Sequence, residues 1–114
     1  MATEEEVESF LIDFKVKLTI WDVLYLDRPK NTQALIDLEI RPIDRKLTLE
    51  SLVTADFSEG PKSDTMLNGA DMWIFGKQVN SSEVYIKITL GTVSSSVICV
   101  SFHISEHPMN YPFK

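Results

Sequence analysis

Four side chains in the last third of the chain carry groups that can move protons or hold a phosphate: Tyr85, His103, Lys77 and Lys87. Cleavage of RNA without a metal needs a group that removes the 2′-hydroxyl proton and a group that protonates the leaving oxygen. It also needs cations for the charge that develops on the phosphate. A phenol, an imidazole and two ammonium groups supply all of these. The same residue types occur on ordinary solvated sheet faces, so the chemistry requires a fold that brings them together.

The stretches that carry these residues have the pattern of β-strands, over residues 71–79, 82–90 and 95–104. In the middle stretch the even positions from Val84 to Leu90 are apolar and the odd positions are polar or amphipathic, which is the period of a half-buried strand. The last stretch repeats this parity. Its even positions are expected in the core, and its odd positions are expected on the other face: Val97, Cys99, Ser101 and His103.

Antiparallel pairing of the last two strands must keep their apolar faces together. One register that fits a short connection sets Tyr85 opposite His103 and Lys87 opposite Ser101, and the other moves each partner by two residues. In both registers these four residues share one patch of the open face.

The strand over 71–79 is expected to join this patch through a three-residue turn at 80–82, which pairs Lys77 with Tyr85. That register also places Trp73 and Phe75 on the open face, although a slip of one residue would reverse the assignment. Aromatic rings there would give unpaired bases surfaces for stacking, worth roughly 1 to 3 kcal/mol per base.

The N-terminal half is predicted to begin with a helix. Thr3 and Glu6 have the spacing of a capping box, and apolar residues three and four apart from Val7 to Leu18 form one stripe. Residues from about 19 to 26 favour a strand, with continuation of the helix as the alternative.

Two further helices are predicted before residue 54. Asn31 or Thr32 can cap a short helix that runs through Leu38, and a second helix is expected from about Pro42 to Leu52.

We therefore expect one α+β domain, with about three helices packed on one face of a twisted antiparallel sheet of three or four strands. Lys62 lies in a predicted loop and is free to reach over a neighbouring surface, where it is a candidate substrate-binding residue. The predicted organisation of the chain 1–114 is a helical half 1–53, a loop 54–70, a sheet 71–104 and an extended tail 105–114.

The charge of the chain is unevenly distributed. The net charge is −6, yet residues 1–60 hold thirteen acidic and seven basic side chains, whereas residues 61–114 hold four of each. A locally positive face on the C-terminal sheet is therefore allowed.

Composition also points to a compartment. The single cysteine has no partner for a disulfide, which fits a reducing cytoplasm. An acidic N-terminus unlike a signal peptide and the lack of an apolar run of about twenty residues predict a protein that is not in the membrane.

His103 and His107 are four residues apart with Glu106 between them. On a helix this spacing would bring both imidazoles to one metal ion, but at the end of a strand it does not. We expect no metal and no other cofactor.

Several segments, taken in order, are similar to the motility quorum-sensing regulator (MqsR) family of bacterial toxins. They are Asp56-Phe57, Gly60-Pro61, 71–77 (DMWIFGK), 84–88 (VYIKI), 99–103 (CVSFH) and 108–113 (PMNYPF). The resemblance covers roughly residues 54–114, and the N-terminal half agrees only in the order of its elements.

This resemblance implies a RelE-like fold, endoribonuclease activity on mRNA without a metal, and neutralisation by an antitoxin encoded beside the toxin. The family's active tyrosine falls on Tyr85. His103 stands where better-known members carry a basic residue, which keeps a proton-transfer group. The alternative is a non-catalytic protein-interaction module of the same fold, and the oligomeric state is left open.

Overall fold

The computed structural model describes residues 1–63 and 69–114 and confirms the α+β class. Its helices are α1 (Glu4–Trp21), α2 (Pro29–Asp37), α3 (Pro42–Glu50) and the short 3-10 helix η1 (Thr54–Asp56). Its strands are β1 (Val23–Tyr25), β2 (Phe57–Lys62), β3 (Met72–Val79), β4 (Ser82–Thr89) and β5 (Val97–Ile104).

The five strands form one sheet in the order β1-β5-β4-β3-β2. β1 runs parallel to β5, and the other neighbours are antiparallel. The prediction of three or four strands, all antiparallel, was wrong. Two parallel strands cannot be joined by a tight turn, so no local sequence pattern predicts that they pair.

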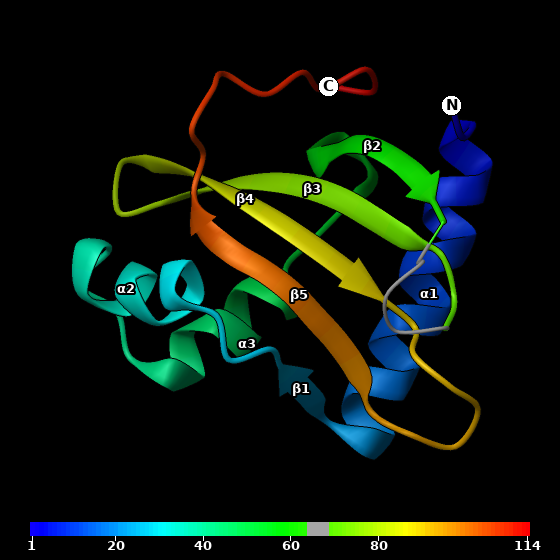
Figure 1. Cartoon of the computed structure of the whole chain (residues 1–114). Coiled ribbons are helices and arrows are strands. Elements are labelled where there is room, and N and C mark those ends of the chain that lie inside the picture. Colours follow the sequence, from blue (N-terminus) through cyan, green and yellow to red (C-terminus); the bar gives the residue numbers. More distant parts are fainter. Residues whose placement is uncertain (64–68) are drawn as a thin grey trace.

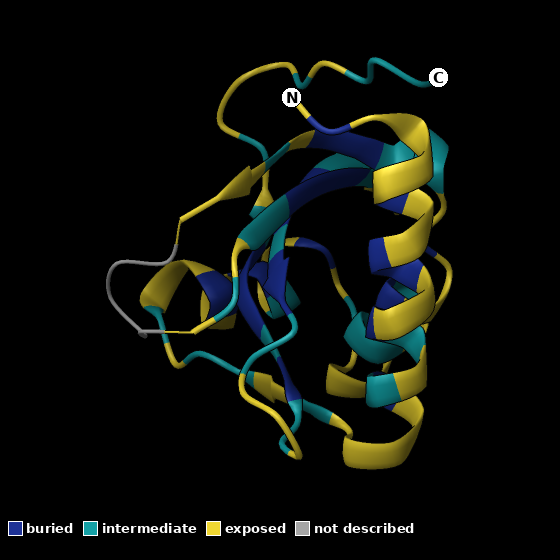
Figure 2. Ribbon diagram, turned by 90° about the vertical axis from the view of Figure 1, so that its right-hand side faces the viewer, coloured by how far each residue is buried: buried dark blue, intermediate teal, exposed yellow. Residues whose placement is uncertain are grey.

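The elements form two layers (Figure 1). α1 and α3 lie on one face of the sheet, and α2 packs along β5 at the side of the sheet. Figure 2 shows the buried side of α1 turned toward the sheet. The core fills the space between, and its largest fully buried side chains include Phe14, Phe57, Phe75 and Phe102. We call the opposite side of the sheet the open face, since among the described residues no helix crosses it.

The predicted capping box at the start of α1 is confirmed. The Glu6 backbone N–H donates to Thr3 Oγ1 at 3.2 Å, and the Thr3 backbone N–H donates to Glu6 Oε1 at 3.0 Å. The predicted apolar stripe is the buried face of the helix. The helix continues to Trp21 and ends where Asp22 adopts a φ of 66°, so the strand β1 is shorter than predicted and begins at Val23.

α2 begins at Pro29, two residues before Asn31, the first of the two predicted caps, because proline is favoured in the first helical turn. Asn31 is instead buried against β5. Its amide donates to the Leu26 and Val100 carbonyls at 3.0 Å each, and its Oδ1 accepts from the Phe102 N–H at 3.0 Å. Beyond the end of β1, the Asn31 side chain thus provides the hydrogen bonds to β5 that a neighbouring strand would otherwise make.

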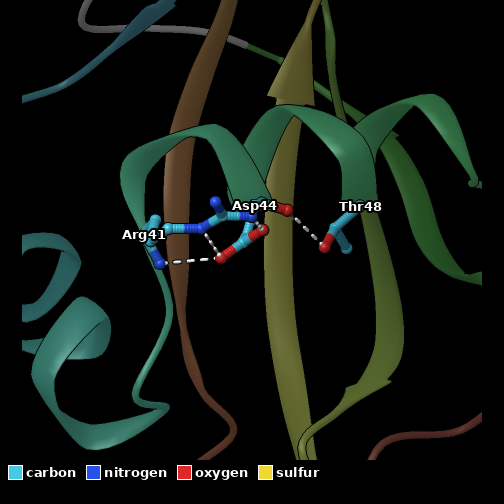
Figure 3. A network of polar contacts seen from close by, with 3 residues as sticks. All are labelled: Arg41, Asp44 and Thr48. Carbon is cyan, nitrogen blue, oxygen red and sulfur yellow. Dashed lines mark hydrogen bonds and ion pairs between the residues drawn. The ribbon is translucent and has the colours of Figure 1, made fainter.

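α3 begins at Pro42 as predicted. Asp44 accepts from the Arg41 backbone N–H at 2.8 Å and from the Arg41 guanidinium at 3.1 Å, while Thr48 Oγ1 donates to the Asp44 carbonyl at 2.8 Å (Figure 3). The charge of Arg41 is therefore satisfied within its own helix.

The predicted register between β3 and β4 was wrong by one residue. Asn80 and Ser81 form a two-residue turn, both with positive φ (48° and 72°), so Val79 pairs with Ser82 and Lys77 with Val84. Two-residue turns with positive φ match the right-handed twist of the strands that they connect, so they are the favoured hairpin turns. The slip transfers Trp73, Phe75 and Lys77 to the face covered by the helices.

The predicted parity of β5 holds only for its second half. Lys87 pairs with Ser101 but Ile88 pairs with Cys99, so Val100 is an extra residue in a β-bulge. Val97 and Cys99 consequently belong to the core, against the prediction that they face outward.

The predicted loop 54–70 also contains structure, namely η1 and β2, and its part over 64–68 lies outside the described residues. Lys62 is the last residue of β2 and pairs with Glu59 at 2.6 Å rather than reaching out from a loop. None of the helices in the described ranges has the length and apolar character needed to span a bilayer.

Candidate active site on the open sheet face

The predicted grouping of four residues on the open face is confirmed. β4 and β5 pair in the first of the two expected registers, with Tyr85 opposite His103 and Lys87 opposite Ser101. The rings of Tyr85 and His103 are stacked, with centroids 5.3 Å apart and planes 16° from parallel. A phenol and an imidazole therefore face the same volume from neighbouring strands.

These residues form the floor of a hollow of about 490 Å³. Ser58 and Glu59 of β2 border it on one side, and the tail from Ser105 to Asn110 borders it on another. In Figure 1 the tail leaves β5 and runs across the ends of β4 and β3 toward β2. A ligand in the hollow would touch three separate parts of the chain.

The tail is held against the sheet through Glu83 of β4. Glu83 Oε1 accepts from the Met109 N–H at 3.1 Å and Oε2 accepts from the Tyr111 hydroxyl at 2.7 Å. The first tail residue continues the pairing of β5, because the Ser105 N–H donates to the Glu83 carbonyl at 2.8 Å. This wall of the hollow is therefore an ordered part of the fold.

The backbone selects the tautomer of His103. Its Nδ1 lies 3.0 Å from the Ile104 carbonyl oxygen. A carbonyl oxygen only accepts, so Nδ1 carries the hydrogen in this contact and the neutral ring keeps its lone pair on Nε2. This tautomer is the one in which the imidazole can accept a proton at Nε2.

The phenol of Tyr85 is biased toward its protonated form. Partial burial raises its pKa, and the nearby Glu59 carboxylate raises it further, against an opposing effect of Lys62. At neutral pH Tyr85 is therefore a hydrogen-bond or proton donor rather than a base.

The ammonium group of Lys87 is disfavoured by its surroundings. Burial lowers its pKa first, and the positive charges of Arg28 and Lys62 lower it further. Lys87 makes no ion pair within residues 1–63 and 69–114. The Glu59 carboxylate opposes these effects in part. Groups with perturbed pKa values in a cleft are candidates for functional residues.

The predicted placement of three site residues on the open face was wrong. Lys77 Nζ donates to Asp56 Oδ2 at 2.9 Å and to the Ser51 carbonyl at 3.3 Å. Trp73 stacks on Phe10 of α1 with ring centroids 4.6 Å apart, and Phe75 is fully buried. The reason is the one-residue slip at the β3-β4 turn.

Lys62 lies beside the site, although on β2. Its charge lowers the pKa of Tyr85 and that of Lys87, so it acts on both. The Glu59 carboxylate raises the pKa of Lys62 itself.

Arg28 and Lys30 are cations beside β5 that the sequence analysis did not identify as site residues. Their only signal in the sequence is that they flank Pro29 at the end of a predicted strand. That strand reaches the site because β1 pairs with β5, which could not be predicted locally.

Within the described parts of the chain, no group of three or more His, Cys, Asp or Glu side chains could hold a metal ion. His103 is in β5 and His107 is in the tail, beyond the end of that strand at Ile104, and both line the hollow.

Comparison of the chain with protein-family models, with curated proteins and with solved structures finds no match. The functional assignment therefore depends on the residues of the site itself.

Proposed function

We propose that this protein is an endoribonuclease that cleaves single-stranded mRNA without a metal, and that it acts as the toxin of a toxin–antitoxin pair. The observation that carries the proposal is the opposed pair of Tyr85 and His103, which points a proton donor and a proton acceptor at one hollow. The resemblance of residues 54–114 to the MqsR family, whose active tyrosine falls on Tyr85, supports the same activity.

The proposed reaction is an intramolecular phosphoryl transfer. His103 Nε2 takes the proton of a ribose 2′-hydroxyl, and the 2′ oxygen attacks the adjacent phosphorus. The bond from phosphorus to the 5′ oxygen breaks, and Tyr85 gives its phenolic proton to that leaving oxygen. The products are a 2′,3′-cyclic phosphate and a 5′-hydroxyl, after which the proton returns from His103 to Tyr85 through water.

The directions of the pKa shifts in the site support this division of roles. A raised pKa at Tyr85 keeps its proton in place until the leaving oxygen needs it. Lys87, which makes no ion pair with a described residue, supplies positive charge for the phosphate oxygens as negative charge develops on them.

The test is expression of wild type, Tyr85→Phe and His103→Ala in a bacterial host, with growth and RNA integrity followed. We expect wild type to slow growth and cut RNA. Removal of either proton-transfer group should lower cleavage by about 10²- to 10⁴-fold. Purified wild type should give 2′,3′-cyclic phosphate ends and should remain active in the presence of a chelator.

Tyr25→Phe is the matched control. Tyr25 lies on β1 beneath the guanidinium of Arg45, and its buried hydroxyl has no hydrogen-bond partner in the described structure. Loss of that hydroxyl should leave both folding and cleavage unchanged.

The outcome that would contradict the proposal is a folded wild type that neither slows growth nor cuts RNA. A protein-interaction module of the same fold would then be the better assignment. A neighbouring gene for a small protein that binds this chain and restores growth would support the toxin assignment and identify the antitoxin.

A further inference from the structure

Arg28 lies at the side of the catalytic hollow, between β1 and α2. The side chain is half-buried, and it precedes Pro29 at the start of α2. Together with the first turn of α2, Arg28 borders a second hollow of about 500 Å³. The other side of this hollow is β5, through Ser101 and His103.

The two hollows meet on β5. Ser101 and His103 belong to both, whereas Tyr85 and Lys87 belong to the first and Arg28 to the second. Neighbouring strands are about 4.8 Å apart, so the path from β4 across β5 to Arg28 is short. The two hollows together form one track, which crosses the strands from β2 toward α2.

The charges along this track are only partly compensated. Lys62 pairs with Glu59 at one end, and Lys30 pairs with Glu106 near the other. Between them, neither Arg28 nor Lys87 makes an ion pair or a side-chain hydrogen bond to any described residue. Two like charges that make no ion pair with a described residue therefore lie near each other.

Ser101 adds a neutral donor between these two cations. It lies opposite Lys87 in the register and is 6% exposed. Its hydroxyl donates no hydrogen bond to another side chain or carbonyl in residues 1–63 and 69–114. A hydroxyl, a guanidinium and an ammonium group therefore line one short part of the surface without a hydrogen bond or ion pair to a described residue. The Lys87 ammonium lies over the Tyr85 ring, 5.9 Å from its centroid.

We propose that Arg28 and Ser101 form a second phosphate-binding subsite, which holds the phosphate next to the scissile one and directs a single RNA strand across the sheet from β2 toward α2. This inference rests on the proposed function and goes beyond it. It identifies the path of the RNA strand across the sheet, and it identifies Arg28 as a specificity residue outside the pair Tyr85 and His103.

A phosphodiester fits this subsite because a guanidinium presents a planar fork of donors that matches two phosphate oxygens. Positively charged grooves that follow the backbone are also the general form of single-strand binding sites. Arg28 supplies the charge and the fork, and Ser101 supplies a donor to a remaining oxygen.

The test is binding of a 2′-O-methyl oligoribonucleotide, which lacks the nucleophilic hydroxyl and is not cut, followed by fluorescence anisotropy over about 50 to 200 mM salt. Each phosphate contact contributes about −0.7 to the slope of log K against log salt concentration for single strands. Arg28→Gln should make the slope less steep by about 0.7 and weaken binding by about tenfold at low salt.

Arg41→Gln is the matched control, since it removes the same charge from the helix side, where Arg41 is satisfied by Asp44 (Figure 3). It should leave the slope unchanged. Ser101→Ala should weaken binding without changing the slope, because the hydroxyl is neutral. Circular dichroism of each variant checks that the fold is kept.

A second readout uses substrate length. A dinucleotide with one phosphate cannot reach Arg28 while it occupies the catalytic hollow, so wild type and Arg28→Gln should bind it equally. A trinucleotide should bind more tightly than the dinucleotide to wild type, but not to Arg28→Gln.

The results separate the two proposals. An unchanged slope in Arg28→Gln, with binding and cleavage by wild type intact, would overturn the second subsite and leave the nuclease proposal standing. Failure of wild type both to bind and to cut RNA would overturn the nuclease proposal and the subsite with it.

Discussion

Replacement of Gly76 by alanine should detach the C-terminal tail from the open face. Gly76 is buried on β3 opposite Tyr85. A Cβ at this position would lie 2.2 Å from Tyr111 Oη and 2.9 Å from Met109 Sδ. Separations under 3 Å are not sustained between such atoms, so the side chains of the tail must move. Tyr111 and Met109 also anchor the tail to Glu83, through the Tyr111 hydroxyl and the Met109 backbone N–H.

The expected loss of stability follows from opposing effects. Loss of the hydrogen bond from the Tyr111 hydroxyl to a carboxylate costs about 1.5 to 3 kcal/mol. Alanine is favoured over glycine in a strand by about 0.5 to 1 kcal/mol, which offsets part of this loss. The free energy of unfolding should therefore fall by about 1 to 2 kcal/mol. With a urea dependence of about 2 kcal/mol per molar, the midpoint should fall by about 0.5 to 1 M.

Urea unfolding followed by fluorescence measures this change, and digestion by a carboxypeptidase measures release of the tail. Tyr111→Phe is the control, because it removes the hydroxyl without adding an atom at Gly76. The effects of Gly76→Ala and Tyr111→Phe share one hydrogen bond, so the double variant should lose less than the sum of the two. A Gly76→Ala protein as stable as wild type, or strictly additive losses, would refute the proposed contact.

Two further substitutions test the site and its support. Lys87→Met should raise the free energy of unfolding at neutral pH by up to about 1 kcal/mol while it weakens RNA binding, because burial and neighbouring cations lower the pKa of Lys87 in the fold. The sign follows from linkage: a lowered lysine pKa disfavours the charged form in the folded state, so the gain over wild type should disappear as the pH rises past the ordinary value of 10.5. Asn31→Ala should cost about 3 kcal/mol in urea unfolding, because it leaves the Val100 carbonyl and the Phe102 N–H at the edge of β5 without partners. An Asn31→Ala protein with wild-type stability would show that water replaces these bonds.

Patterns carried by adjacent residues predicted the local structure well. The capping box of α1 needs only Thr3 and Glu6, which form it within one helical turn. The pairing of Tyr85 with His103 followed from two alternating strands and the requirement that their apolar faces coincide. The first prediction depends on the spacing of two residues in a helix, and the second depends on the alternation of apolar residues in a strand. Both patterns are properties of short stretches of chain.

The sequence predicted the wrong face of the sheet for several residues. Each error arose where one additional or missing residue reverses the alternation of faces along a strand. A turn of two residues instead of three transferred Trp73 and Lys77 to the opposite face. A bulge at Val100 moved Cys99 from the predicted outer face into the core, where burial raises the pKa of its thiol to about 12. Both choices depend on the twist of the sheet and on the packing beneath it, so alternation alone cannot predict them.

Residues far apart in the sequence were missed for a different reason. Arg28 reaches the site because β1 pairs in parallel with β5, and Asn31 was predicted to cap a helix but completes the edge of that strand. The partner of a parallel strand is chosen by the tertiary structure, so a sequence that predicts a strand there does not predict its neighbour.

Part of the acidic net charge of the chain lies away from the open face. The carboxylates of the first turn of α1 lie on the helix side, in a molecule whose smallest extent is 25 Å. At physiological ionic strength charges are screened over about 8 Å, so those carboxylates do not cancel cations on the open face. Glu59 and Glu106, which line the first hollow, are each paired with a lysine. Arg28 and Lys87 make no ion pair with a described residue, so they are the cations that the phosphates of the proposed substrate would meet there.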